Sequence, residues 1–292
     1  MSRSARAPLR IDLAGGWTDV PAFADAEDGA VVNVAITQYV RGTLDDSGAL
    51  TFAHDVTAAG LGSSATEHVV AHALRNSDAD LDEIAEAAFA AETAEGVPGG
   101  RQDQYAACYG GLNFMTFTRP APARGPVSIE RLTMPEAHLV ALEKRLVLVD
   151  SGVARLSGEI HRAVWSAYAR HDDGVTGALL ALKQYGRAMR DAIAGSDFGG
   201  IKHVLNENWH QQKRLHASVT NETVESIFAL AMKSGASAGK ACGAGGGGAL
   251  VFYASSDADA IALRRALRAE GLTVIDAFFD FEGLHDEDDA PA

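Results

Sequence analysis

Residues 60–65 read Gly-Leu-Gly-Ser-Ser-Ala and lead into ATEHVVAHAL, a run with the composition of a helix. The two glycines let the backbone turn tightly, and Ser63 or Ser64 is the expected N-cap. Free N–H groups, the positive helix end and two hydroxyls together form an anion site, and a hydroxyl also binds Mg²⁺. The alternative is an ordinary capped helix after a glycine turn. The stretch is not a Walker A loop, because no lysine follows, and it is not a GxGxxG dinucleotide motif.

A second glycine turn lies upstream, where residues 7–19 read APLRIDLAGGWTD. An apolar strand runs into a double glycine, so the chain can bend and aim Asp19 back across the strand. A carboxylate accepts hydrogen bonds from sugar hydroxyls, and the Arg10 guanidinium would stabilise phosphate charge. An ordinary turn with a surface aspartate is the alternative.

Two acids, Glu92 and Asp103, flank a glycine-rich turn at residues 96–100. Apolar residues recur with helical spacing between Leu81 and Thr93, which places Glu92 on the inward face, where a carboxylate needs a partner. If the two acids converge, one would hold a hard cation and the other would accept a proton from a nucleophile. The alternative is a pair of acids on a helix surface.

A third glycine cluster, GKACGAGGGG at residues 239–248, runs directly into the apolar segment ALVFY. The five glycines within residues 243–248, beside a core strand, cost backbone entropy, which indicates that another group approaches this loop closely. A flexible linker is the weaker interpretation, because a linker would not enter a buried strand.

The composition excludes several classes of protein. The 292 residues are 47% apolar and 22% charged, as in globular chains, and the formal net charge is −14. With no basic cluster, nucleic acid is an unfavourable partner. Neither a signal peptide nor an apolar run of about 20 residues is recognisable, so we expect no membrane contact. Two cysteines, Cys108 and Cys242, suit the cytoplasm. His68 and His72 have helical spacing but lack a third metal ligand, so we interpret them as packed histidines.

The order of the elements predicts an α+β fold with two lobes. Residues 1–145 form the β-rich lobe, and residues 146–292 form a helix-rich lobe that ends on the glycine loop and its strands. The expected strands are 10–13, 30–44, 49–56, 146–149, 249–253 and 272–279, and helices are expected at 81–93, within 158–233 and at 257–270.

Taken in order, the four motifs resemble the GHMP family of small-molecule kinases, and in particular its sugar branch, the heptose 7-phosphate kinases and fucokinase-like enzymes. The likeness is carried by RIDLAGGWTDVPAF, GLGSSA, GGRQDQYAACYGG and GKACGAGGGGALVFY, and it also includes SGVARLS at 151–157 and NENWHQQK at 206–213. It covers nearly the whole chain. It implies a two-lobed fold around a shared cleft and in-line transfer of a phosphoryl group from ATP to a hydroxyl of a sugar or sugar phosphate, and the expected acceptor is the anomeric hydroxyl.

The resemblance also implies a role for each motif residue. Asp103 would be the base or anchor for the substrate hydroxyl, and Arg10 would lie near the transferred phosphoryl group. Mg²⁺ would be held by Ser64 and Glu92. The ATP phosphates would be held by Gly60, Leu61, Gly62, Ser63, Ser64 and Ala65, and the substrate by Thr18, Asp19, Gly245 and Gly246. We expect a monomer or a homodimer.

One departure from the family pattern concerns nucleotide recognition. Only residues 45–59 fill the interval in which the family has several dozen residues, including a helix and a strand that help to form the adenine pocket. Two alternatives therefore stay open beside the kinase: a transferase of the same fold that does not use ATP, and a non-catalytic sugar-binding homologue. The retained acids Glu92 and Asp103 favour the kinase, whereas the short interval favours the alternatives.

Overall fold

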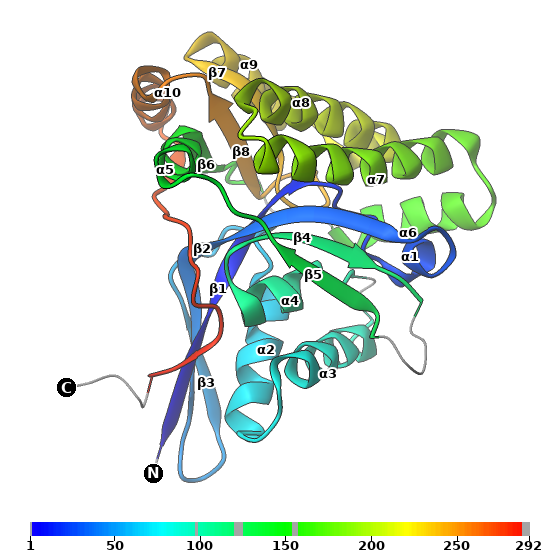
Figure 1. The fold of residues 1–292 in the computed structure, drawn as a ribbon, viewed down its shortest axis with the longest axis vertical. Coiled ribbons are helices and arrows are strands. Elements are labelled where there is room, and N and C mark those ends of the chain that lie inside the picture. The colour runs from blue at the N-terminus through cyan, green and yellow to red at the C-terminus, as the bar shows by residue number, and fades with distance from the viewer. Residues whose placement is uncertain (1, 97–98, 120–124, 154–156, 288–292) are drawn as a thin grey trace.

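The computed structural model describes residues 2–96, 99–119, 125–153 and 157–287. Its larger sheet has six antiparallel strands in the order β10-β1-β2-β4-β5, with β3 paired to the distal half of β2 (Figure 1). The strands are β1 (Arg3–Ala14), β2 (Gly29–Leu44), β3 (Leu50–His54), β4 (Leu112–Phe117), β5 (Val127–Arg131) and β10 (His285–Asp286).

Strand β1 is much longer than the predicted segment 10–13. Its polar N-terminal half pairs residue by residue with the end of β2, from Arg3 opposite Leu44 to Ala7 opposite Val40. The long partner strand supplies the backbone hydrogen bonds, so the segment is extended despite its polar composition. The prediction of a strand at 30–44 is confirmed by β2.

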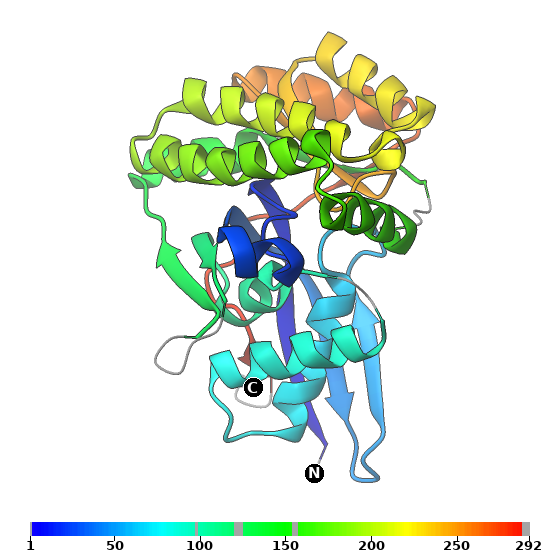
Figure 2. The same cartoon turned by 90° about the vertical axis from the view of Figure 1, so that its right-hand side faces the viewer.

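Three helices lie on one face of this sheet, in the lower half of Figure 2. The first and third pack on β1 and β2, and the second packs on these two helices. They bury a cluster of apolar side chains against β1 and β2, including Val69, Ala88 and Tyr105. A short helix, α1 (Pro21–Glu27), follows the double-glycine turn. The three helices are α2 (Ser63–Arg75), α3 (Leu81–Ala94) and α4 (Gln102–Tyr109).

The smaller sheet has four antiparallel strands in the order β7-β8-β6-β9, and helices surround it. The predicted strand at 272–279 is wrong beyond residue 275, because the chain leaves the sheet there and Phe279 forms a single bridge to Ile36 of β2. The strands are β6 (Leu146–Asp150), β7 (Ala236–Ala241), β8 (Ala249–Ala254) and β9 (Thr273–Ile275), and the helices are α5 (Glu136–Arg145), α6 (Ser157–Ala169), α7 (Asp173–Ala194), α8 (Phe198–Leu215), the 3₁₀ turn η1 (Ala217–Val219), α9 (Glu222–Lys233) and α10 (Asp257–Ala269).

The two sheets share a core. Helix α7 packs against β1 and β2, while α8 packs on α7 and on β7 (Figure 1). One apolar cluster therefore contains Ile11 and Val34 of the larger sheet together with Val251 of the smaller one. The antiparallel sheets and the many helices confirm the α+β class. Within the described residues, no helix combines the length and apolar character needed to cross a membrane.

Candidate active site

A cavity of about 120 Å³ lies where β1, the double-glycine turn, the start of α4 and the third glycine cluster meet. Its wall carries one arginine and four carboxylates, which suits a hydrophilic ligand. Its lining residues are Arg10, Asp12, Gly16, Trp17, Asp19, Val20, Glu92, Gly99, Gly100, Gln102, Asp103, Gly158, His161, Cys242, Gly243 and Ala244.

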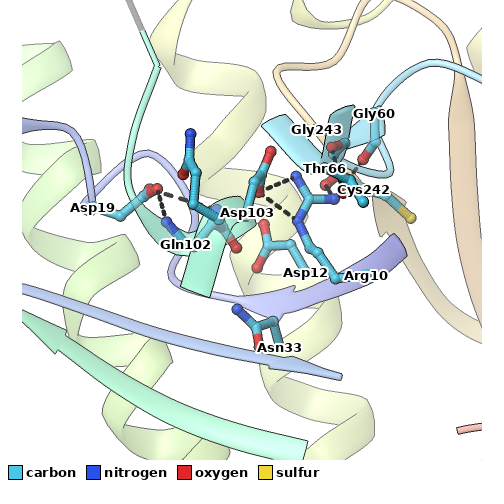
Figure 3. A network of polar contacts seen from close by, with 12 residues as sticks. Arg10, Asp12, Asp19, Asn33, Gly60, Thr66, Gln102, Asp103, Cys242 and Gly243 are labelled. Carbon is cyan, nitrogen blue, oxygen red and sulfur yellow. Dashed lines mark hydrogen bonds and ion pairs between the residues drawn. The ribbon is translucent and has the colours of Figure 1, made fainter. Parts of the chain in front are cut away.

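The cavity contains the predicted pair Arg10 and Asp103 in direct contact. The Nε and Nη2 atoms of Arg10 each lie 2.7 Å from Asp103 Oδ1 (Figure 3). Burial disfavours the charged form of Arg10, but the negative charges of Asp103 and Asp12 outweigh it and raise the pKa of the guanidinium. Asp103 Oδ2 points toward Gly62, at which an added Cβ would lie 3.3 Å away. The catalytic carboxylate predicted from sequence is thus next to the predicted phosphate loop.

Asp19 is brought to the same cavity from the double-glycine turn. Its carboxylate accepts a hydrogen bond from the Gln102 backbone N–H at 3.2 Å (Figure 3). Burial, and then the charge of Asp103, raise the pKa of Asp19 to about 7, although the Gln102 N–H opposes this shift. Gly100 makes room for it, since a Cβ there would lie 1.8 Å from Asp19 Oδ2. The prediction that this turn aims Asp19 inward agrees with the structure.

Glu92 lies on the buried face of α3, as its position in the apolar stripe predicts. Its partner is Gln104 of α4, whose Nε2 donates to Glu92 Oε2 at 2.7 Å. Burial, and then the charge of Asp103, raise the pKa of Glu92 to about 7, and hydrogen bonds from Gln104 and Ser64 act in the opposite direction.

This arrangement fits Mg²⁺. The ion usually binds through one or two carboxylates, substrate phosphates and water, and the Glu92 carboxylate beside the Ser64 hydroxyl offers such donors. Among the described residues, no cluster of three or more acidic, histidine or cysteine side chains could hold a metal by itself. The residues present therefore fit a metal that arrives with a phosphate ligand.

The start of α2 has no side-chain cap, so its first backbone N–H groups are available, as an anion site requires. Gly60 and Gly62 both have positive φ, at 93° and 87°, which non-glycine residues rarely adopt. The predicted serine N-cap is wrong, because the helix begins at Ser63 and its N-cap is Gly62, with no side-chain cap hydrogen bond. The first N–H groups of the helix thus remain for a ligand. Within the described part of the chain, the buried Ser63 Oγ also has no hydrogen-bond partner.

Helix α8 ties two glycine segments to the cavity. Asn208 Oδ1 accepts from the Gly15 backbone N–H at 2.9 Å, and Gln212 Nε2 donates to the Gly243 carbonyl at 2.7 Å. Both residues belong to the NENWHQQK segment, which the sequence marked only by resemblance. Residues 154–156 of the SGVARLS segment, residues 97–98 of the turn before Asp103, and the terminal acidic residues 288–292 lie outside the described residues.

Some predicted residues do not line the cavity. Thr18 is fully buried, and its hydroxyl donates to the Gly15 carbonyl at 2.7 Å and accepts from the Ala30 N–H at 3.0 Å. Gly245 and Gly246 pack against η1, whereas Gly243 and Ala244 reach the cavity instead. Leu61 and Ala65 are core residues, so only their backbone groups are available to a phosphate.

The structure adds residues that the sequence analysis missed. Trp17 lines the cavity and stacks on His161 of α6, with ring centroids 4.4 Å apart. Asp12 of β1 and Lys240 of β7 form a buried ion pair at 2.7 Å. The alternation of a strand, which puts Asp12 on the same face as Arg10, was the available signal for the aspartate.

Comparison with known proteins agrees with this geometry. Residues 33–111 match the GHMP kinases N terminal domain, and residues 189–272 match the GHMP kinases C terminal domain. The first match contains the phosphate loop, Glu92 and Asp103, and the second contains the third glycine cluster. The chain belongs to the GHMP kinase family. The predicted family and enzyme class are therefore confirmed, and the protein is a kinase.

Individual GHMP kinases resemble the chain over nearly its full length. The D-glycero-alpha-D-manno-heptose 7-phosphate kinase of Campylobacter jejuni is 29% identical, covering 95% of this chain and 96% of that protein. The bifunctional fucokinase/GDP-fucose pyrophosphorylase of Arabidopsis thaliana is 26% identical over 89% of this chain but only 30% of its own length. A putative sugar kinase from Campylobacter jejuni has a similar structure, with a TM-score of 0.72, 28% identity and 98% coverage of both chains.

The family fold is kept at low identity. Galactokinase from Lactococcus lactis, solved with galactose, is 15% identical and covers 97% of this chain and 95% of its own, with a TM-score of 0.73. The alignment with the heptose 7-phosphate kinase spans 340 positions, whereas the chain has 292 residues, so at least 48 positions fall opposite a gap in this chain. This GHMP kinase is therefore shortened relative to that relative.

Proposed function

We propose that the protein transfers the terminal phosphoryl group of ATP, with Mg²⁺, to a hydroxyl of a sugar or sugar phosphate, and that the acceptor resembles heptose 7-phosphate. The observation that supports this proposal most strongly is the Arg10–Asp103 ion pair. It lines the same cavity as Asp19 and lies against the phosphate loop at Gly62. The 29% identity to a heptose 7-phosphate kinase supports the acceptor class. We further propose that the two lobes divide near residue 146.

Different residues would bind the phosphoryl donor and the acceptor. ATP supplies the phosphoryl group. The open start of α2 would bind the phosphates through backbone N–H groups, with the Ser63 hydroxyl as a further donor. Ser64 and Glu92 would hold Mg²⁺, which favours the ionised form of Glu92 over the protonated form.

Asp103 has one oxygen for each of two tasks. Oδ1 is held by Arg10, and Oδ2 is left to orient the acceptor hydroxyl and accept its proton. The hydrogen bonds from Arg10 to Asp103, to the Gly60 carbonyl and to the Cys242 carbonyl use four of the five N–H groups of the guanidinium. The remaining one can stabilise charge on the transferred group.

Asp19 is placed to bind the acceptor rather than to act in the transfer. Its oxygens face the cavity opposite Gly100 and are held by Gln102, so they can accept hydrogen bonds from sugar hydroxyls. Trp17, in the same wall, offers an apolar ring face against which a sugar ring can pack.

The test is a direct search for the product. The full chain is incubated with ATP, Mg²⁺ and a panel containing heptose 7-phosphate, free heptose, fucose and galactose, and ³¹P NMR follows ADP and any new sugar phosphate. A phosphate ester formed with one sugar, together with stoichiometric ADP, is the expected result. Sugar binding without transfer would favour the non-catalytic homologue, and transfer only from a donor other than ATP would favour the other transferase.

A further inference from the structure

Two cations join β1 of the larger sheet to β7 and the residue that follows it, beside the cavity. Lys240, fully buried in β7, donates to Asp12 Oδ2 at 2.7 Å and to the Asp12 backbone carbonyl at 2.8 Å. In the reverse direction, Arg10 of β1 donates to the backbone carbonyl of Cys242, just beyond β7, at 3.3 Å. The base of the third glycine cluster is thereby fixed to the strand that carries the catalytic arginine.

In this ion pair, Lys240 contacts only one oxygen of the Asp12 carboxylate, Oδ2. Asp12 is only 3% exposed and lines the cavity, yet its Oδ1 has no hydrogen-bond partner among the residues that the structure describes. A buried carboxylate oxygen without a partner is costly, so a native protein that keeps one usually has a use for it. Arg10 and Asp12 are two positions apart on β1 and project to the same side as Asp103 (Figure 3).

Gly16 leaves free the space beside the Asp12 carboxylate. A Cβ at Gly16 would lie 2.2 Å from Asp12 Oδ2 and 3.3 Å from Gln102 Nε2, so any larger residue would fill the space between these two side chains. Four carboxylates line the cavity, those of Asp12, Asp19, Glu92 and Asp103. Lys240 balances the charge of Asp12 as Arg10 balances that of Asp103.

On the basis of the proposed function, we propose that Asp12 is a specificity-determining residue whose Oδ1 accepts a hydrogen bond from a second, non-reacting hydroxyl of the acceptor sugar. Lys240 is its positioning residue, because it fixes the other oxygen and balances the charge. An ion pair that served stability alone could be replaced by apolar side chains without loss of ligand selectivity. The unpartnered oxygen of a residue that lines the cavity is the feature that a purely stabilising ion pair does not explain.

The test uses sugar binding, which does not require turnover. Calorimetry measures the affinity of the full chain for heptose 7-phosphate and fucose, and then for monodeoxy analogues of whichever sugar binds. For the wild type, one analogue should bind roughly ten- to a hundred-fold more weakly than the parent sugar, the range expected for a hydrogen bond to a charged group.

Two double variants separate ligand binding from folding. Asp12→Ala with Lys240→Met removes both charges and the acceptor oxygen. This variant should bind the parent sugar as weakly as the wild type binds the weakened monodeoxy analogue. Its affinity for ATP should stay within about twofold of the wild-type value. Asp12→Asn with Lys240→Met keeps an acceptor oxygen and should lose less. Asp276→Asn, which disrupts an exposed ion pair with Arg268 and lies outside the cavity lining, is the charge control and should match the wild type.

The outcomes are distinct. An Ala–Met variant that keeps the wild-type preference for the parent sugar over every analogue overturns the proposal, as does an equal loss of all sugars and ATP. If neither double variant folds, a structure of the wild type with its sugar decides: no hydroxyl within hydrogen-bond distance of Asp12 Oδ1 refutes the assignment. Sugar selectivity through Asp12 without phosphoryl transfer would uphold it while rejecting the proposed function, and the absence of any sugar binding would overturn both.

Discussion

Replacing Glu92 by glutamine should stabilise the protein at high pH, although it removes a group that we assign to Mg²⁺. The pKa of Glu92 is raised from 4.5 to about 7, so the folded state holds the proton more tightly than the unfolded state. The contribution of Glu92 to the free energy of unfolding is therefore complete below pH 4.5 and is lost as the pH rises to about 7. At roughly 1.4 kcal/mol per pH unit, the ionised side chain costs the metal-free protein up to about 3 kcal/mol.

Glutamine has nearly the same shape but cannot ionise. At pH 8.5 without divalent cations, Glu92→Gln should raise the free energy of unfolding by about 1 to 3 kcal/mol, the lower figure allowing for the weaker hydrogen bond with Gln104. At pH 4 the side chain is largely protonated in both the folded and the unfolded state, so the two proteins should agree within about 0.5 kcal/mol.

Urea unfolding at the two pH values in EDTA, followed by circular dichroism, measures the difference. Glu95→Gln is the matched control, because this side chain lies just beyond the end of the same helix, α3, is 60% exposed and should change stability by no more than about 0.5 kcal/mol. A gain for Glu92→Gln that is equal at both pH values, or a loss at pH 8.5, would refute the argument that burial of an ionised carboxylate sets this cost.

Three further predictions concern the reaction. Asp103→Asn should lower turnover by about 10² to 10⁴ while the thermal transition stays close to that of the wild type, and steady-state kinetics retaining a third of the activity would remove Asp103 from the chemistry. Asp19→Ala should weaken sugar binding far more than ATP binding in calorimetric titrations, and an equal loss of both would make it a structural residue. If residues 45–59 are too short for an adenine pocket, ATP should bind weakly and kcat/KM should differ little between ATP and GTP, with Ser64→Ala lowering both alike, whereas a preference above roughly a hundredfold would demonstrate base recognition.

The sequence was sufficient for features that depend on a few neighbouring residues. The positive φ angles at Gly60 and Gly62, the helix that follows them and the inward face of Glu92 all follow from local backbone freedom and helical periodicity. The order of the glycine motifs and acids was specific enough to indicate the family and the α+β class. Those properties are encoded within short stretches of sequence, which is why the sequence alone predicts them.

The boundaries of elements were less predictable where a distant partner decided them. Strand β1 extends to Arg3 because β2 offers it hydrogen bonds, and the expected strand after Ile275 does not form although its residues favour one. The serine cap expected for α2 was replaced by Gly62, since the chain reaches the helix through a left-handed turn. Strand pairing and chain direction, rather than local propensity, set these limits.

Only the tertiary structure decided which polar groups meet. Asp12 and Lys240 are 228 residues apart, and nothing in either segment predicts that β1 and β7 bring them together in the core. Thr18, adjacent to Asp19 in the same motif, turns instead into the backbone of its own loop. Burial and pairing depend on the packing of two sheets through α7 and α8, so the amino-acid sequence named the candidate chemical groups while the fold selected those that share a cavity.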